Sequence, residues 1–178
     1  DKAIKIIINS KMRRTGICGA TETLLIDRFI SKEVIPIFVN KLREAGCSLK
    51  GDQETITIDN SVDLASEEDW KTEYLDAILS IKVVDGVNEA ISHIEEYSSN
   101  HTESIVTENK STAEKFLSNV DSAIVMHNAS TQFADGGEFG MGAEIGISTG
   151  RIHARGPVGA AQLTSFKYIV RGKDQIRD

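Results

Sequence analysis

The first third of the chain changes from a helical to an extended pattern of apolar positions. Residues 2–11 carry apolar side chains all round, which is typical of a buried helix. A short glycine-containing turn at residues 16–20 ends this pattern. The apolar run at residues 23–26 stops at Asp27 and predicts a buried strand.

A second helix is predicted by apolar positions that recur at helical spacing over residues 34–45. It stops at Gly46, which indicates a glycine C-cap, and Pro36 either kinks it or lies near its start. The following stretch, residues 51–70, is polar and weakly patterned. Within it, residues 55–58 (TITI) predict a possible strand.

Strands and helices alternate through the middle of the chain. One helix has apolar positions from Val87 to Ile94, and a second begins at a capping box of Ser111 with Glu114. The strands are predicted at residues 77–84, 104–107 and 122–126. This order predicts a layered α/β domain with a mostly parallel sheet, whose active site is expected beyond the carboxyl ends of the strands.

The chain becomes glycine-rich and irregular after Asn128. Glycines in residues 135–144 let the backbone approach a ligand closely or form an anion-binding nest, although a long surface loop is the alternative. No glycine fingerprint for a dinucleotide follows a strand and opens a helix. The last apolar segment, residues 163–170, predicts a strand with nothing to cover it, and such a strand often pairs with another subunit.

Composition narrows the class of protein. The chain has 178 residues, enough for one domain, and its net charge of -7 argues against non-specific nucleic-acid binding. No apolar run is long enough to span a bilayer, and no signal peptide is visible. Two cysteines without an export signal indicate a reduced, cytoplasmic protein, and no zinc-site spacing points to a metal. Because position 1 is not Met, a fragment of a longer protein is expected.

Cys18 is the candidate for covalent chemistry. It lies in a short loop between Gly16 and Gly19 and follows two arginines, so a substrate can reach it and nearby positive charge can favour its thiolate. A cysteine that merely fills a tight loop is the alternative. Cys47 follows Gly46 and opens an apolar segment, which indicates a structural role.

Four segments together resemble the gamma-glutamyl phosphate reductase family of the aldehyde dehydrogenase superfamily: residues 15–25, 125–131, 135–144 and 153–157. The resemblance implies a three-layer aldehyde-dehydrogenase-like catalytic domain at residues 1–162. It also implies a C-terminal oligomerisation strand at residues 163–178. Most of the nucleotide-binding domain would lie outside this chain, so the chain alone is expected to be inactive.

The resemblance assigns chemistry to two residues. Cys18 would be the nucleophile that attacks gamma-glutamyl phosphate and forms a thioester, which NADPH reduces to glutamate 5-semialdehyde in proline biosynthesis. Glu73 stands where relatives bind the ribose hydroxyls of the nicotinamide nucleotide. The alternative for Glu73 is one more exposed carboxylate in an acidic stretch.

The same resemblance places polar residues around the substrate. Asn128, Ser130 and Thr131 would lie at the mouth of the substrate site, or they cap the end of a strand. Gly136 and Gly137 would belong to a loop that walls the glutamyl pocket.

Basic residues near the end of the chain have several possible roles. His153 and Arg155 could bind phosphate, the glutamate carboxylate or a neighbouring subunit, and a solvated surface arginine is the alternative. His101 is a weaker candidate, because a histidine after Ser-Ser-Asn is more often a solvated loop residue.

The resemblance further implies a homo-oligomer and a functional association with glutamate 5-kinase. Two other interpretations stay open. The chain could be the C-terminal unit of a bifunctional pyrroline-5-carboxylate synthase, or a non-catalytic α/β interaction module.

Overall fold

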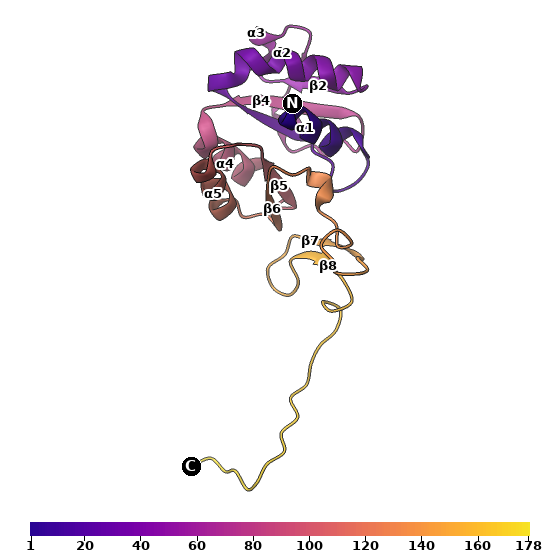
Figure 1. The fold of residues 1–178 in the computed structure, drawn as a ribbon, viewed down its shortest axis with the longest axis vertical. Coiled ribbons are helices and arrows are strands. Elements are labelled where there is room, and N and C mark those ends of the chain that lie inside the picture. Colours follow the sequence, from indigo (N-terminus) through magenta and orange to yellow (C-terminus); the bar gives the residue numbers. More distant parts are fainter.

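A parallel four-stranded sheet forms the centre of the molecule (Figure 1). The computed structural model describes residues 1–178, and the strands lie in the order β1-β4-β2-β3. Pairing of Leu24 with Ile81 fixes the register of β1 against β4. The strands are β1 (Thr23–Asp27), β2 (Ser48–Gly51), β3 (Asp63–Leu64) and β4 (Ile78–Val84).

Helices α2 (Arg28–Glu44) and α3 (Gln53–Ile58) lie over one face of this sheet, and α1 (Lys2–Met12) runs beside it (Figure 1). Side chains spaced three and four residues apart on α2 face the strands, which is the helical pattern that buries one side. The main core cluster contains Ile7, Ile26, Ile35, Phe38, Val39, Leu42, Cys47, Leu49, Val62, Leu79, Ile81 and Val83.

A second layer lies on the opposite side of the sheet (Figure 1). It contains a separate parallel pair of strands and two helices around a smaller core of Ile91, Phe116 and Val120. Its elements are α4 (Gly86–Tyr97), β5 (Thr102–Ile105), α5 (Lys110–Asn119) and β6 (Ile124–His127). The predicted layered α/β fold with a mostly parallel sheet is therefore confirmed, with helices on both sides of the central strands.

The chain after β6 is less regular. A 3-10 turn, η2 (Thr131–Phe133), leads to an antiparallel pair, β7 (Gly146–Ser148) and β8 (Gly156–Val158). No strand forms at residues 163–170, which extend away from the body (Figure 1). Phe166 and Val170 are 80% and 88% exposed because no strand of the same chain is within reach. The oligomerisation strand stays a prediction that concerns a second chain.

The predicted strand at residues 55–58 is wrong, because these residues belong to α3. The alternating Thr-Ile pattern looks extended, but Asp52 caps a helix there and its carboxylate accepts a hydrogen bond from Thr55 N. Thr55 also packs under Gly51, where a Cβ would lie 2.6 Å from the Thr55 methyl group. The segment therefore covers the sheet instead of joining it.

Two predicted features of helices need correction. Helix α5 begins at Asn109, whose side chain accepts a hydrogen bond from Thr112 N, and not at a capping box of Ser111 with Glu114. Helix α1 is buried on one side only, because its other side faces solvent.

Helix α2 ends as predicted. Gly46 has a φ of +87° and Cys47 N donates to Leu42 O, which is the glycine-ended cap expected there. Pro36 lies inside the helix on its exposed side, well after the first turn.

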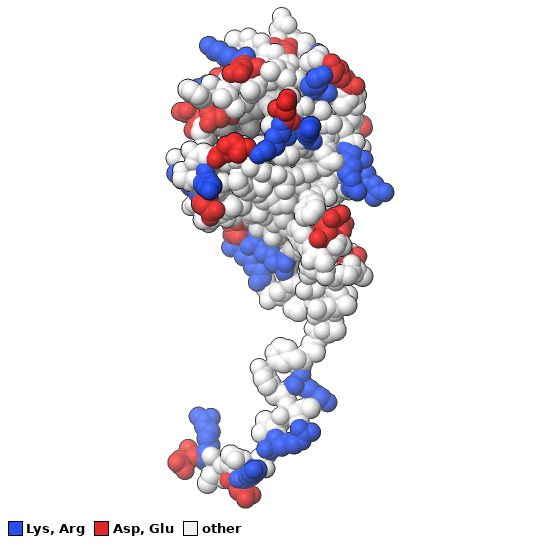
Figure 2. Space-filling model, in the orientation of Figure 1, with Lys and Arg blue, Asp and Glu red and all other residues white.

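Three features of the molecule bear on its class of function. No helix combines the length and the apolar character needed to cross a bilayer. No group of three or more His, Cys, Asp or Glu side chains is arranged to hold a metal ion. Figure 2 shows acidic and basic side chains interspersed over the visible face of the body, without a broad basic surface.

His93, a residue of α4, is buried in an aromatic cluster. Its ring packs edge-on to Trp70 at 5.7 Å and against Tyr97 at 4.6 Å. Burial, together with a smaller effect of the nearby Lys82, lowers the pKa of His93 from 6.5 to about 4. The folded protein therefore holds this imidazole neutral under conditions in which the unfolded chain takes up a proton.

We expect this difference to make stability depend on pH. The contribution of neutral His93 is complete above pH 6.5 and is lost as the pH falls towards about 4. The loss should reach about 1 to 3 kcal/mol. Urea unfolding of His93→Phe, which keeps a ring against Trp70, should depend less on pH in this window than unfolding of the parent. Equal pH dependence of the two proteins would contradict the expectation.

Candidate active site

Cys18 and Glu73 meet at the amino ends of two neighbouring strands. Cys18 lies in the loop between α1 and β1, and Glu73 lies in the segment that leads to β4. Parallel pairing of Thr23 with Ser80 holds side by side the two segments that lead into these strands. The expectation of a site beyond the carboxyl ends is therefore wrong for these two residues, because both precede their strands.

A cleft of about 580 Å³ opens between the central sheet and the second layer. Cys18, Glu73 and Thr131 of the predicted site line it, and His101 joins them. The deeper walls come from apolar side chains of α1, β1 and α4. An exposed cysteine at such a cleft can receive a small acyl substrate.

Carboxylates, and not Arg13 or Arg14, dominate the charge around Cys18. The pKa of its thiol is raised, mainly because partial burial disfavours the thiolate and also because Glu144 and Glu73 are negative. The backbone N–H groups of Cys18 and Gly19 act in the opposite direction and favour the negative form of the sulfur. In this chain, therefore, backbone amides are the groups that favour the reactive thiolate.

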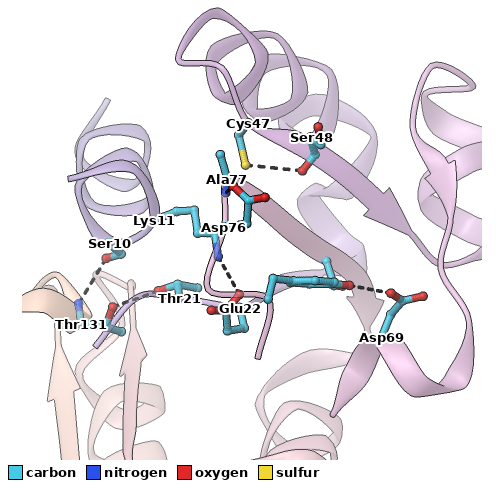
Figure 3. Close-up of polar contacts among 12 residues, drawn as sticks. Ser10, Lys11, Thr21, Glu22, Cys47, Ser48, Asp69, Asp76, Ala77 and Thr131 are labelled. Carbon is cyan, nitrogen blue, oxygen red and sulfur yellow. Dashed lines mark hydrogen bonds and ion pairs between the residues drawn. The ribbon is translucent and has the colours of Figure 1, made fainter. Parts of the chain in front are cut away.

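A buried ion pair lies directly behind the cysteine loop. Lys11 Nζ lies 2.6 Å from Glu22 Oε2, and the Lys11 side chain is fully buried (Figure 3). The Glu22 carbonyl accepts a hydrogen bond from Ser80 N, so the same residue joins the loop to β4. Burial raises the pKa of Glu22, while Lys11 lowers it. The pair fixes the end of α1 against the start of β1.

A second polar network supports the segment that carries Glu73. Tyr74, the next residue, shares hydrogen bonds with Asp69 at 2.7 Å and with Ser80 at 2.8 Å. Lys50 Nζ also donates to the Asp69 carboxylate at 2.6 Å. These donors hold the pKa of Asp69 far below its usual range despite its burial. Glu73 itself is exposed, so its carboxylate is free to accept hydrogen bonds from a ligand.

Asn128 and Ser130 lie outside the lining of the main cleft. The Asn128 side chain binds the backbone of Thr107, accepting from its N–H and donating to its carbonyl at 3.0 Å each. Ser130 accepts from Ser10 Oγ and caps η2. These contacts match the alternative of residues that cap a strand end, and a substrate role for either residue stays a prediction.

The glycine-rich loop reaches the site through one carboxylate. Gly136 N donates to Glu144 Oε2 at 2.7 Å, and Glu144 is close enough to Cys18 to raise its pKa. Gly137 N binds the Asp135 side chain, and neither glycine lines the cleft. The charge of Glu144 thus reaches Cys18, while the role of Gly136 and Gly137 in a loop that walls the substrate stays a prediction.

The basic candidates near the C-terminus lie away from the cleft. Arg155 binds the carboxylate and the carbonyl of Asp121 at 2.6 and 2.8 Å, and this pairing ties β8 to the turn before β6. His153 contacts the Gln162 carbonyl at 2.8 Å. Their predicted binding roles stay untested, but both side chains already have partners within the chain.

Sequence reasoning undervalued His101, which lines the cleft, and missed Gln132, which supports the cysteine loop. His101 is half-buried, and its Nε2 has no partner within the chain. Burial lowers its pKa, which favours the neutral imidazole. Gln132 was overlooked because its contacts are with residues more than 100 positions away. In the sequence, His101 was marked only by its place in a polar stretch just before a predicted strand.

Comparisons with known proteins identify close relatives. Gamma-glutamyl phosphate reductase of Rhodospirillum rubrum is 62% identical over 176 residues, which cover 99% of this chain and 41% of that protein. The crystal structure of the Thermotoga maritima protein of the same name has a TM-score of 0.97 at 53% identity, covering 99% of this chain and 43% of that one. No family model matches the chain.

The fold extends to more distant proteins. An acetylating aldehyde dehydrogenase from Geobacillus thermoglucosidasius has a TM-score of 0.70 at 20% identity, covering 99% of this chain and 49% of that one. The resemblance to gamma-glutamyl phosphate reductase and the aldehyde-dehydrogenase-like fold are thus confirmed. The chain spans about two fifths of the length of the curated relatives that it matches.

Proposed function

We propose that this chain forms the cysteine-bearing part of a gamma-glutamyl phosphate reductase. Such an enzyme reduces gamma-glutamyl phosphate to glutamate 5-semialdehyde and phosphate with NADPH. The observation that supports this most is an exposed Cys18 at the mouth of a cleft, in a chain that is 62% identical to a protein of that name.

Cys18 would act as the nucleophile. Its sulfur forms a bond to the acyl carbon of the substrate, the bond from that carbon to the phosphate oxygen breaks, and phosphate leaves. The resulting thioester accepts hydride readily, because sulfur donates little electron density to the carbonyl. After reduction the carbon–sulfur bond breaks, and the aldehyde and the thiol are released. The Cys18 N–H is a candidate donor to the oxyanion of each step.

The residues present fit a nicotinamide nucleotide. NADPH supplies the hydride when it is bound. Glu73 is exposed at the cleft that also holds Cys18, and a carboxylate suits the two hydroxyls of a ribose. The hydrogen bonds of Tyr74 to Asp69 and Ser80 keep the backbone next to Glu73 in place. Glu73 would therefore position the nucleotide and take no part in bond breaking.

The proposal is tested with the complete protein that carries this sequence. In the reverse direction, purified protein should convert NADP⁺ to NADPH when it is given both glutamate 5-semialdehyde and phosphate. Omission of phosphate should abolish this reaction, because phosphate must attack the thioester. A rate that does not depend on phosphate, or no reaction at all, would refute the proposed function.

Glu73→Gln should weaken nucleotide binding. The neutral amide loses a charge-assisted hydrogen bond, so we expect the KM for NADPH to rise about tenfold, with a smaller change in kcat. Steady-state kinetics with varied NADPH measures this. Glu68→Gln is the matched control, since Glu68 is also exposed and lies five residues away in the same acidic stretch. A normal KM in Glu73→Gln, or an equal rise in both variants, would contradict the assignment.

A further inference from the structure

The turn η2 binds the loop that carries Cys18 (residues 14–19), although the two are far apart in the sequence. Thr131 is 8% exposed, and its Oγ1 donates to the Gly19 carbonyl at 2.6 Å. Because that hydroxyl hydrogen is used, Thr21 Oγ1 donates to Thr131 Oγ1 at 2.9 Å. Figure 3 shows Thr21 and Ser10 both turned towards Thr131. The hydroxyl therefore contacts the loop directly after Cys18.

The backbone of η2 is itself anchored to α1. Thr131 N donates to Ser10 Oγ at 3.2 Å, and Ser10 Oγ donates to Ser130 Oγ at 3.1 Å. The Ser10 carbonyl accepts from Thr21 N, so the end of α1, the end of the cysteine loop and η2 share one network. This network gives Thr131 a fixed position from which to hold Gly19.

Gln132 holds the other end of the loop. Its side-chain amide donates to the Ser10 carbonyl at 2.8 Å and to the Arg14 carbonyl at 3.0 Å. Arg14 precedes Cys18 and Gly19 follows it, so η2 binds the loop on both sides of the cysteine. The side chain of Gln132 is buried, and its Oε1 also accepts from Arg13 Nη1 at 3.4 Å, at the same end of the loop.

Gly19 is the residue that most needs such a hold. A glycine has the widest choice of backbone angles, so its own φ and ψ do not hold the loop in one conformation. A Cβ at this position would lie 3.2 Å from the Thr131 carbonyl oxygen, which shows how closely the turn and the loop approach. The hydrogen bond to the Gly19 carbonyl holds the peptide plane that follows Gly19 and so limits the movement of the loop next to Cys18.

We infer that Thr131 and Gln132 are positioning residues, which hold the Cys18 loop by its Gly19 and Arg14 carbonyls and so fix the place of the nucleophile. Neither is a catalytic residue, since each acts through the loop. This changes the role expected for Thr131 from substrate contact to loop support. The inference rests on the proposed function only where the assay measures turnover.

The test compares two changes at one position in the complete protein. Thr131→Val keeps the shape and removes the hydroxyl, whereas Thr131→Ser keeps the hydroxyl. Because a misplaced nucleophile costs about 10- to 100-fold, we expect kcat of Thr131→Val to fall by that factor with little change in the KM for NADPH. Thr131→Ser should stay within about twofold of the parent.

A second readout follows the thiols directly. Peptide-level mass spectrometry after brief iodoacetamide treatment gives separate labelling rates for Cys18 and Cys47. In Thr131→Val the Cys18 rate should fall about fivefold to tenfold, because the loop no longer holds the thiol in its reactive position. The Cys47 rate should not change, since Cys47 is 3% exposed and reports global opening. Thr55→Val, which alters another buried threonine that contacts a carbonyl (Ile81 O), is the matched control and should change neither rate.

Two results would overturn the inference. One is a Thr131→Val protein with the parent kcat and the parent Cys18 labelling rate. The other is faster labelling of Cys47 in parallel with the loss of activity, which would show that the hydroxyl supports the whole fold. If the complete protein reduces no acyl phosphate, the proposed function fails, and the labelling comparison still decides the role of Thr131.

Discussion

Replacing Cys18 with serine should abolish reduction of the acyl phosphate in the complete protein. A serine hydroxyl is almost never ionised near neutral pH, and an ester accepts hydride less readily than a thioester. We expect kcat to fall on the order of 10⁴-fold or more. The loss is measured in the reverse direction, as phosphate-dependent reduction of NADP⁺ by glutamate 5-semialdehyde.

A covalent readout separates loss of the nucleophile from loss of the fold. Incubation of the parent with acyl phosphate in the absence of NADPH should add a glutamyl group to the peptide that contains Cys18, and Cys18→Ser should lack this adduct. Cys47→Ala is the control, because Cys47 is buried in the core and has a pKa raised to about 11 by burial. It should keep its activity. An active Cys18→Ser protein would remove the basis of the proposed mechanism.

The raised pKa of Cys18 also sets how the thiol responds to pH. Since burial and two carboxylates disfavour the thiolate, only a small fraction is ionised at neutral pH in this chain. The rate of Cys18 alkylation should therefore keep rising above pH 9, the ordinary pKa of a cysteine thiol. The sequence had suggested the opposite from Arg13 and Arg14, because neighbours in sequence were taken as neighbours in space.

The elements with strong hydrophobic patterns could be predicted from the sequence. Strands β1 and β4 appear where they were expected, and helix α2 ends where its apolar pattern stops but begins at Arg28, six residues before that pattern. Helix α3 was missed because Thr-Ile alternation resembles a strand, whereas the Asp52 cap decides the local structure. A long hydrophobic pattern therefore predicted the element correctly. A pattern of only four residues did not, because one capping side chain determined the local structure.

The candidate site shows a different limit. Cys18 was recognisable from its loop and from the resemblance, because both signals are local. Thr131 was also named, but for substrate contact, and Gln132 was not named at all. Their hydrogen bonds to Gly19 and Arg14 join positions more than 100 residues apart, and no periodicity reports such a pairing.

Loss of Lys11 should cause the largest loss of stability among single changes at this site. Lys11→Met leaves the Glu22 carboxylate without its partner next to a fully buried side chain. Breaking a buried ion pair in this way costs about 3 to 5 kcal/mol, and the partial exposure of Glu22 places the expected value near 3 kcal/mol. Urea unfolding followed by labelling of Cys47, which lies in the adjoining core, measures the change.

The double variant Lys11→Met/Glu22→Gln should recover much of the lost stability, because no unpaired buried charge remains. The sign of the pH effect provides a second check. Burial raises the pKa of Glu22, so without Lys11 its carboxyl binds a proton more readily in the folded than in the unfolded state. Lys11→Met should thus be less destabilised at pH 5 than at pH 8. A double variant as unstable as Lys11→Met, with no pH dependence, would mean that Lys11 acts through packing and not through its charge.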